Sequence, residues 1–296
     1  MKYVLTGGAG HITKPLAEKL LKAGHTVTVI GRNPDNLKDL KALGADTAIG
    51  SVEDVAFLKE AFAGADAVYT MVPPNFGAKE WKKWIGHIGS NYAEAIKANN
   101  VKYVVNLSSI GAHLPDGVGP VSGLHLVELE LNKSGANVKH LRPGYFFDNL
   151  LANVGLVKGM NIIGGNFGGA DLKMILSSPA DIAEVAAEEL LNHNFTGSSF
   201  RYISSDERTT ADISKAIGNN IGKPELAWVT FKNEDTLNGM LQAGLPEEIA
   251  KNYVEMGDSI HQGRMFEDYW KHRPAQLGKT KLEDFAKVFA QVYSAS

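Results

Sequence analysis

The feature that most constrains the fold of this 296-residue sequence is the alternation of strand-like and helix-like segments in its first half. Short apolar runs rich in strand-forming residues predict strands at Tyr3–Leu5, Thr26–Ile30, Thr47–Ile49, Ala67–Met71, Lys102–Leu107 and Val138–Leu141. Segments with apolar residues at helical spacing lie between them, at Leu16–Ala23, Val55–Phe62 and Trp81–Ala98. Because parallel strands need crossover connections, this order predicts a doubly wound α/β fold, a parallel sheet covered by helices on both faces.

A glycine-rich turn, Thr6-Gly7-Gly8-Ala9-Gly10-His11-Ile12, joins the first predicted strand to the first predicted helix. The first turn of a helix leaves backbone N–H groups unpaired and carries the positive end of the helix dipole, so it suits an anionic phosphate. Gly7 allows a tight turn, and Gly10 lets a pyrophosphate approach the amides. The third glycine of the usual dinucleotide motif is missing, but the position in the first strand–helix unit favours a dinucleotide over a turn without a ligand.

The end of the second predicted strand indicates which dinucleotide we expect. NAD-binding units usually have Asp or Glu there, and its carboxylate binds the ribose hydroxyls and repels a 2′-phosphate. This chain has Arg32 instead, whose planar guanidinium suits phosphate oxygens. We therefore expect NADP(H) in preference to NAD(H), the alternative being that Arg32 is a solvated surface residue.

Composition argues against several other kinds of protein. The formal net charge of -3 gives no electrostatic reason to expect a nucleic acid partner. Cysteine is absent, which excludes disulfides and thiolate chemistry, and the scattered histidines lack the spacing of a helix-borne zinc site, so we predict no metal. No apolar stretch approaches the roughly 20 residues that span a bilayer. We expect a cytoplasmic protein without a membrane partner.

The pattern loosens after residue 150, where glycines interrupt a stretch that we expect to be irregular. A helix at Ile182–Leu191, a strand at Phe200–Ile203 and a last helix at Leu282–Tyr293 follow it. We predict an NAD(P)-binding Rossmann domain over residues 1–150, which the strand near 199–204 can rejoin, and a smaller, mostly helical substrate or partner domain over residues 151–296.

This chain resembles the NmrA-like family, whose members are atypical short-chain dehydrogenases. Four motifs, in the same order along most of the chain, carry the resemblance. They are TGGAGHI at the start, the Leu107-Ser108-Ser109 strand end, SGLHLVELELNKSGANVKHLRPGYFFDNL at 122–150 and SPADIAEVAAEEL at 178–190. The resemblance implies cofactor contacts by Gly7, Gly10, His11, Ile12, Arg32, Met71, Val72, Pro73, Ser108, Pro143, Gly144 and Tyr145. The pyrophosphate would lie at the first glycines, the adenosine ribose at Arg32 and the nicotinamide near Tyr145.

The usual catalytic pair of this superfamily, Tyr-x-x-x-Lys, is missing: none of the nine tyrosines has a lysine four residues on. In the alignment on SGLHLVELE, Val121 takes the tyrosine position and His125 the lysine position. We predict that His125 contacts the cofactor, and that His125, Tyr145 and Ser109 are the candidate catalytic residues. The alternatives are structural: a helix histidine bonded to a carbonyl, a packed aromatic ring and a strand-end serine capping a turn.

The resemblance implies either NADPH-dependent quinone reduction, with hydride supplied by the cofactor, or redox sensing without turnover. We predict an NADP(H)-dependent oxidoreductase that transfers hydride to a small conjugated acceptor such as a quinone. Aromatic residues after two predicted strands suit a flat acceptor: Phe76, Trp81, Trp84, Tyr145, Phe146 and Phe147. The alternatives are a non-catalytic NADP-sensing protein that binds a protein partner, and an imine or enal reductase. The sequence leaves the oligomeric state open.

Overall fold

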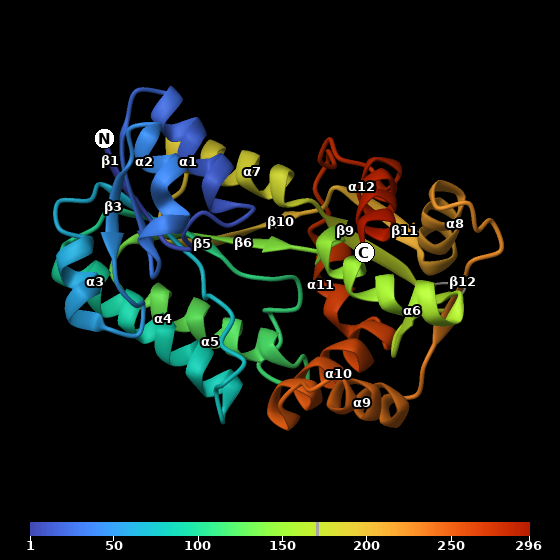
Figure 1. Ribbon diagram of the computed structural model, residues 1–296. Helices are drawn as coiled ribbons and strands as arrows, with labels where there is room; N and C mark the ends of the chain where they lie inside the picture. Colours follow the sequence, from blue (N-terminus) through green and yellow to red (C-terminus); the bar gives the residue numbers. More distant parts are fainter. Residues whose placement is uncertain (170–171) are drawn as a thin grey trace.

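A seven-stranded parallel sheet forms the centre of the protein in the computed structural model, which describes residues 1–169 and 172–296 (Figure 1). Its order is β10-β6-β5-β4-β1-β2-β3, and every neighbouring pair is parallel. The strands are β1 (Lys2–Leu5), β2 (Thr26–Gly31), β3 (Asp46–Ile49), β4 (Ala67–Thr70), β5 (Tyr103–Leu107), β6 (Asn137–Pro143) and β10 (Ser198–Ile203). The predicted doubly wound α/β fold is confirmed.

Helices cover both faces of this sheet (Figure 1). One face carries α1 (Thr13–Lys22), the short helices η1 (Pro34–Leu37) and α2 (Lys38–Ala42), and α7 (Pro179–Asn192). The other face carries α3 (Val55–Ala61), α4 (Trp81–Ala98) and α5 (Pro120–Asn132). Glycines bring α4 and α5 close together: a Cβ at Gly89 would lie 2.7 Å from Val127 Cα, and one at Gly123 would lie 2.8 Å from the Lys82 carbonyl.

The second half of the chain adds two small sheets that we did not predict. Strands β7 (Tyr145–Phe146), β9 (Lys173–Ser177) and β11 (Asp206–Thr209) form one, and β8 (Ile162–Gly165) and β12 (Ala227–Thr230) form the other. The glycine-rich stretch that we expected to be irregular contains β8 and helix α6 (Val154–Met160). Gly164 allows close strand pairing there, because a Cβ at this position would lie 2.1 Å from the Val229 carbonyl oxygen.

Helices make up most of the remaining described chain. They are η2 (Phe147–Asn153), α8 (Thr210–Asn220), α9 (Asn233–Gln242), α10 (Glu247–His261), η3 (Arg264–Phe266), α11 (Glu267–Lys271) and α12 (Leu282–Ala295). No helix in residues 1–169 and 172–296 has the length and apolar character needed to cross a bilayer. Strand β10 returns to the main sheet and pairs with β6 from Ser198 to Ile203.

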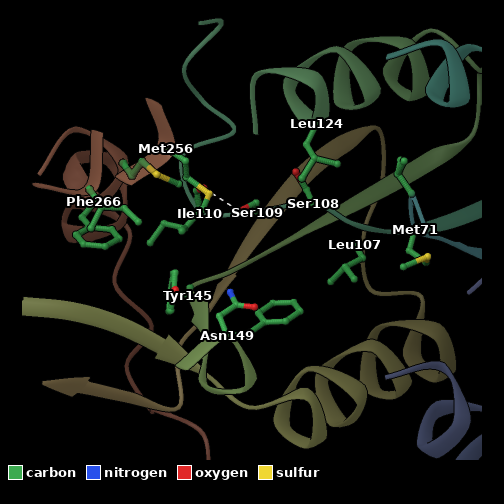
Figure 2. A pocket seen from close by; sticks show the side chains of 15 residues that line it. Met71, Leu107, Ser108, Ser109, Ile110, Leu124, Tyr145, Asn149, Met256 and Phe266 are labelled. Atoms are coloured by element: carbon green, nitrogen blue, oxygen red, sulfur yellow. Dashed lines mark hydrogen bonds between the residues drawn. The ribbon is translucent and has the colours of Figure 1, made fainter. Parts of the chain in front are cut away.

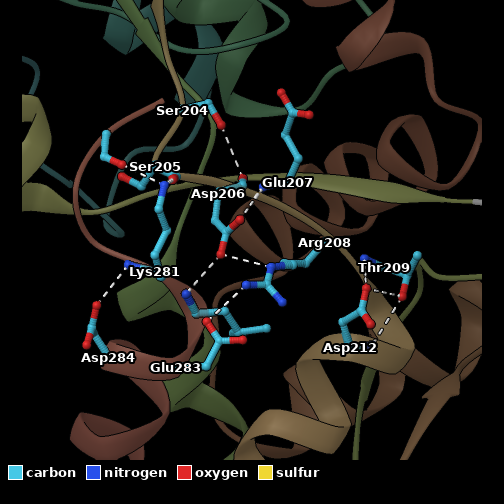
Figure 3. A network of polar contacts seen from close by, with 12 residues as sticks. Ser204, Ser205, Asp206, Glu207, Arg208, Thr209, Asp212, Lys281, Glu283 and Asp284 are labelled. Carbon is cyan, nitrogen blue, oxygen red and sulfur yellow. Dashed lines mark hydrogen bonds and ion pairs between the residues drawn. The ribbon is translucent and has the colours of Figure 1, made fainter. Parts of the chain in front are cut away.

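A polar network attaches the C-terminal helix α12 to the turn between β10 and β11 (Figure 3). The Asp206 carboxylate accepts hydrogen bonds from Arg208 Nε at 2.9 Å and from the backbone N–H of Leu282 at 3.0 Å. Lys281 Nζ donates to the carbonyls of Ser205 and Gly278, both at 2.7 Å. These bonds hold α12 where it packs into the core.

His140 on β6 is a buried neutral histidine, with 2% of its surface exposed. Its Nδ1 lies 3.1 Å from Asn106 Nδ2, and its Nε2 lies 2.9 Å from Asn132 Oδ1. The two amides therefore match one neutral form, in which Nδ1 accepts and Nε2–H donates. Burial lowers the pKa of His140 to about 4.

We predict that His140 makes the protein less stable in mild acid. Its pKa lies below the value of about 6.5 in the unfolded chain, so the unfolded state binds more protons and stability falls as pH falls from 6.5 towards 4. The free energy of unfolding should lose about 2 kcal/mol between pH 7 and pH 5 through this group. Urea denaturation of the wild type and of His140→Gln at both pH values measures the difference, and an equal loss in both proteins would contradict the assignment.

Candidate active site

The glycine turn runs from the end of β1 into α1, as predicted. Gly7 has φ of 101°, and a Cβ there would lie 2.6 Å from Thr13 Oγ1, so both its conformation and its surroundings require glycine. Within the described chain, no side chain caps the start of α1 at Ile12, and the first turn has no acidic residue. This helix N-terminus is therefore open to an anion.

Two side chains, Thr6 of the turn and Tyr92 of α4, hold the segment after β4 close to the turn. Thr6 Oγ1 accepts a hydrogen bond from the Met71 N–H at 2.8 Å, and Tyr92 donates its hydroxyl proton to the Met71 carbonyl at 2.7 Å. Val72 and Pro73, which we predicted to flank the cofactor, continue from this anchored point. The exposed His11 places Nδ1 2.8 Å from Asp148 Oδ2 on η2, which bridges the turn to the second half of the chain.

Arg32 follows β2 at the same edge of the sheet as the glycine turn and is exposed. The carboxyl ends of β1 and β2 meet at this edge because the strands pair in parallel, with Leu5 opposite Val29. Arg32 therefore lies at the sheet edge where doubly wound folds bind their ligands.

A cavity of about 280 Å³ opens at the carboxyl ends of β4, β5 and β6 (Figure 2). The sheet side contributes Met71, Val72, Leu107, Ser108, Ser109, Ile110, Gly144, Tyr145 and Phe146. Leu124 of α5, Asn149 of η2, Met256 and Ile260 of α10, and Met265 and Phe266 of η3 complete the wall. No lining residue is charged, and most are apolar: three methionines, three aromatic residues and five aliphatic residues.

Several predicted site residues meet at this cavity: Met71, Val72, Ser108, Ser109, Gly144 and Tyr145. Gly144 is required where the chain leaves β6, because a Cβ there would lie 2.3 Å from the Ile175 carbonyl oxygen. Its N–H donates to the Ile203 carbonyl at 3.0 Å and to Ser177 Oγ at 2.9 Å. Pro143 ends β6 inside the sheet, and its carbonyl accepts from the Ile110 N–H at 2.8 Å. These bonds fix where Tyr145 emerges.

Tyr145 packs its ring edge-on against Phe167, with 5.6 Å between ring centroids, and faces the cavity (Figure 2). Burial raises the pKa of its phenol above the ordinary value of 10, and nearby Tyr253 adds to the effect. The phenol is therefore protonated at neutral pH and can donate a hydrogen bond to a group in the cavity.

The two serines at the end of β5 differ in where their protons go. Ser108 Oγ donates to Glu128 Oε1 at 2.6 Å, and Arg142 binds the same carboxylate through Nε at 3.0 Å and Nη2 at 2.6 Å. Ser108 therefore presents an acceptor oxygen to the cavity. Ser109 Oγ donates to the Ile110 carbonyl at 2.9 Å. Glu128 was not predicted, although a carboxylate on the otherwise apolar buried face of the 120–132 segment was an available signal.

The structure does not bring His125 to this cavity. Its Nδ1 donates to the Ala112 carbonyl at 2.8 Å, and its ring lines a second cavity of about 390 Å³ with Arg142, Asp268 and His272. Leu124, one position earlier, reaches the first cavity instead. Adjacent helical residues point about 100° apart, so Leu124 and His125 face different cavities. The contact of His125 with the nicotinamide ribose stays a prediction.

The expected aromatic set divides between the cavity and the packing around it. Tyr145 and Phe146 line the cavity, whereas Phe147 stacks on Phe285 in the core at 5.2 Å. Phe76 and Trp81 join Tyr253 of α10 in a separate aromatic cluster. Trp84 donates its indole N–H to Glu53 at 3.1 Å near the surface.

Nothing in the sequence indicated the cavity residues that come from later in the chain. Met256, Ile260, Met265 and Phe266 lie on helices without a recognisable motif. Asn149 lies within the 122–150 motif but was not predicted as a site residue. In the part of the chain that the structure describes, no three His, Asp or Glu side chains are grouped as a metal site would require.

Comparison with known proteins identifies the family of this chain. The model of the NAD(P)H-binding family matches residues 7–193. The chain is 23% identical to the NAD(P)H azoreductase of Xenophilus azovorans over 86% of this chain and 85% of that protein. The NADPH-dependent quinone oxidoreductase QOR2 of Escherichia coli, solved with NADPH, has a TM-score of 0.82 at 21% identity, covering 97% of this chain and 99% of that one. The Citrobacter sp. triphenylmethane reductase, solved with NADP(H), has a TM-score of 0.79 at 19% identity, covering 97% and 99%.

The family match extends over more than half of the chain, and it begins at Gly7 of the turn whose geometry requires glycine. The solved structures share the fold along nearly its whole length. The protein therefore belongs to the NAD(P)H-binding family, and it shares its fold with the NADPH-dependent quinone oxidoreductase and the triphenylmethane reductase named above.

Proposed function

We propose that this protein is an NADPH-dependent reductase that transfers hydride to a small, uncharged, conjugated acceptor such as a quinone. The observation that carries the proposal is the uncharged cavity at the carboxyl edge of the sheet, next to an uncapped helix N-terminus. The related proteins named above are an azoreductase, a quinone oxidoreductase and a dye reductase, which supports reduction of a conjugated molecule.

The residues around the glycine turn fit a dinucleotide. Gly7 and Gly10 keep side chains away from the amides, and the N–H groups of His11 and Ile12 would face the pyrophosphate. Arg32 would bind the 2′-phosphate, which favours NADPH over NADH. Met71, Val72, Pro73 and Ser108 would contact the cofactor, and Pro143, Gly144 and Tyr145 would lie near its nicotinamide. We do not assign His125 to the cofactor, because it lines the other cavity.

The bound reduced nicotinamide supplies the hydride, and the protein orients the acceptor and balances charge. Tyr145 donates a hydrogen bond to the acceptor oxygen on which negative charge develops, and keeps its own proton because burial raises its pKa. The proton that completes the reduction comes from solvent. Ser109 and Ile110, which follow β5, line the same cavity and would contact the acceptor.

The lining of the cavity selects for an uncharged acceptor. A sulfonate or a fixed cation would lose its hydration there without gaining a counter-charge, which is costly. Thioether and aromatic side chains favour a flat apolar ring. We therefore expect neutral quinones to be better acceptors than charged dyes of similar size.

We predict acceptor-dependent oxidation of NADPH with a kcat/KM that is at least about tenfold higher for a neutral quinone than for its sulfonated analogue. Steady-state assays that follow NADPH absorbance with matched pairs of acceptors measure this ratio, and enals and imines in the same panel test the alternative substrates. Tight NADPH binding without turnover of any acceptor would reject the reductase and favour the NADP-sensing protein.

We predict that Tyr145→Phe lowers kcat about 100-fold, since it removes the hydrogen-bond donor to the developing negative charge but keeps the ring. Calorimetry should find the affinity for NADPH unchanged. Tyr293→Phe on α12 is the matched control and should leave kcat unaltered. Equal kcat values for wild type and Tyr145→Phe would remove the phenol from the mechanism.

We predict that Arg32→Ala weakens NADPH binding about tenfold and leaves NADH binding unchanged, because it removes a charge-assisted contact to the 2′-phosphate. Lys38→Ala, which removes an exposed cation paired with Asp35, is the control. Fluorescence titration with both cofactors gives the two dissociation constants. If NADPH and NADH are affected alike, Arg32 does not select the cofactor.

A further inference from the structure

Helix α10 joins the acceptor cavity to the main sheet domain, although it follows β6 by more than 100 residues of sequence. Met256 and Ile260 on α10 line the cavity. The preceding turns of the same helix pack against the start of α4, where Tyr253 meets Trp81 with 5.4 Å between ring centroids. The position of the acceptor wall therefore depends on how α10 is held against α4.

The start of α4 has no cap of its own. Glu80 at the cap position makes no side-chain bond there, and the first turn contains no acidic residue. Helix α10 supplies what is missing: Glu248 Oε1 accepts a hydrogen bond from the Trp81 N–H at 2.9 Å. Glu255, two turns later on α10, adds a second carboxylate near the positive end of α4.

Lys82, in the first turn of α4, connects three segments. Its Nζ lies 2.8 Å from Glu255 Oε1 and 3.0 Å from Glu255 Oε2 on α10, and 2.8 Å from Asp116 Oδ1 in the loop between β5 and α5. The N–H of Gly119 in that loop donates to the same Glu255 at 3.2 Å. The loop is pressed onto α10, since a Cβ at Gly119 would lie 2.1 Å from the Asn252 carbonyl oxygen.

This ion pair differs from an isolated surface pair. The Lys82 side chain is 28% exposed, and one ammonium lies between two carboxylates. Partial burial lowers the pKa of Lys82, but its bonds to Asp116 and Glu255 outweigh burial and raise the pKa above 10.5. Without the ammonium, Asp116 and Glu255 would repel each other across the joint between the loop and α10.

We propose that Lys82 is a positioning residue for the acceptor: its ammonium holds α10 against α4 and the β5–α5 loop, so that Met256 and Ile260 form the cavity wall. The inference rests on the proposed function, because the wall matters only if an acceptor binds there. It assigns Lys82 no contact with the cofactor and no step in the chemistry.

Lys82→Met tests the proposal, because it keeps the length of the side chain and removes the charge. We expect the KM for a neutral quinone to rise about fivefold, with kcat within about twofold of wild type and the affinity for NADPH unchanged. Lys82→Arg should recover most of the loss in KM. Lys83→Met is the matched control: Lys83 is the next residue, but it pairs with Glu80 on the surface, and its removal should change neither constant.

Hydrogen exchange of residues 247–261 gives a readout that needs no turnover. Exchange should be faster in Lys82→Met than in wild type and Lys83→Met. Unchanged exchange in Lys82→Met, or faster exchange with an unchanged KM, overturns the proposal. If the wild type reduces no acceptor, the proposed function fails separately from this proposal. Quenching of tryptophan fluorescence then measures binding of the same quinone without turnover. Weaker quinone binding only in Lys82→Met supports the positioning role, and equal binding in all variants overturns it.

Discussion

The parallel pairing of β1 with two neighbours is the constraint on which the site depends. β1 pairs with β2 on one side and with β4 on the other, so the chain crosses to opposite faces of the sheet on leaving these strands. A crevice forms at the carboxyl edge where the crossovers diverge. The glycine turn after β1, Arg32 after β2 and Met71 after β4 all meet this crevice because their strands run in the same direction. A register shift in β1 would move the glycine turn away from both Arg32 and Met71.

A buried ion pair lies behind Ser108, outside the wall of the cavity. Arg142 and Glu128 have side chains that are 8% and 7% exposed, and two hydrogen bonds join them. Arg142 also lies over the Phe200 ring at 4.3 Å. A charge left alone at this depth would be costly, so the pair makes α5, β6 and β10 interdependent. Its consequence for the site is the orientation of Ser108, whose proton is directed away from the cavity.

The sequence predicted the elements whose patterns are local and missed those that depend on distant partners. The main-sheet strands were found because they are apolar runs, and α7 was found because Pro179 and Asp181 mark its first turn. The strands of the two small sheets were missed because they are two to five residues long and are stabilised by partners far along the chain. Motif alignment placed His125 on α5, but the sequence did not show which cavity it would face, because adjacent helical residues point about 100° apart. The α10 side of the cavity has no local signal, because Lys82 and Glu255 become partners only when the chain has folded.

The missing Tyr-x-x-x-Lys pair limits which acceptors the proposed chemistry can serve. In that pair the lysine lowers the pKa of the tyrosine, whereas here the cavity wall contains no cation and burial raises the pKa of Tyr145. Tyr145 is therefore a weak acid. A simple ketone that accepts hydride becomes a strongly basic alkoxide and needs help from a stronger acid or a positive charge. A quinone becomes a phenolate-like anion, with a proton affinity close to that of tyrosine itself, because its ring delocalises the charge. A protein without the lysine is thus suited to acceptors that stabilise their own negative charge by conjugation.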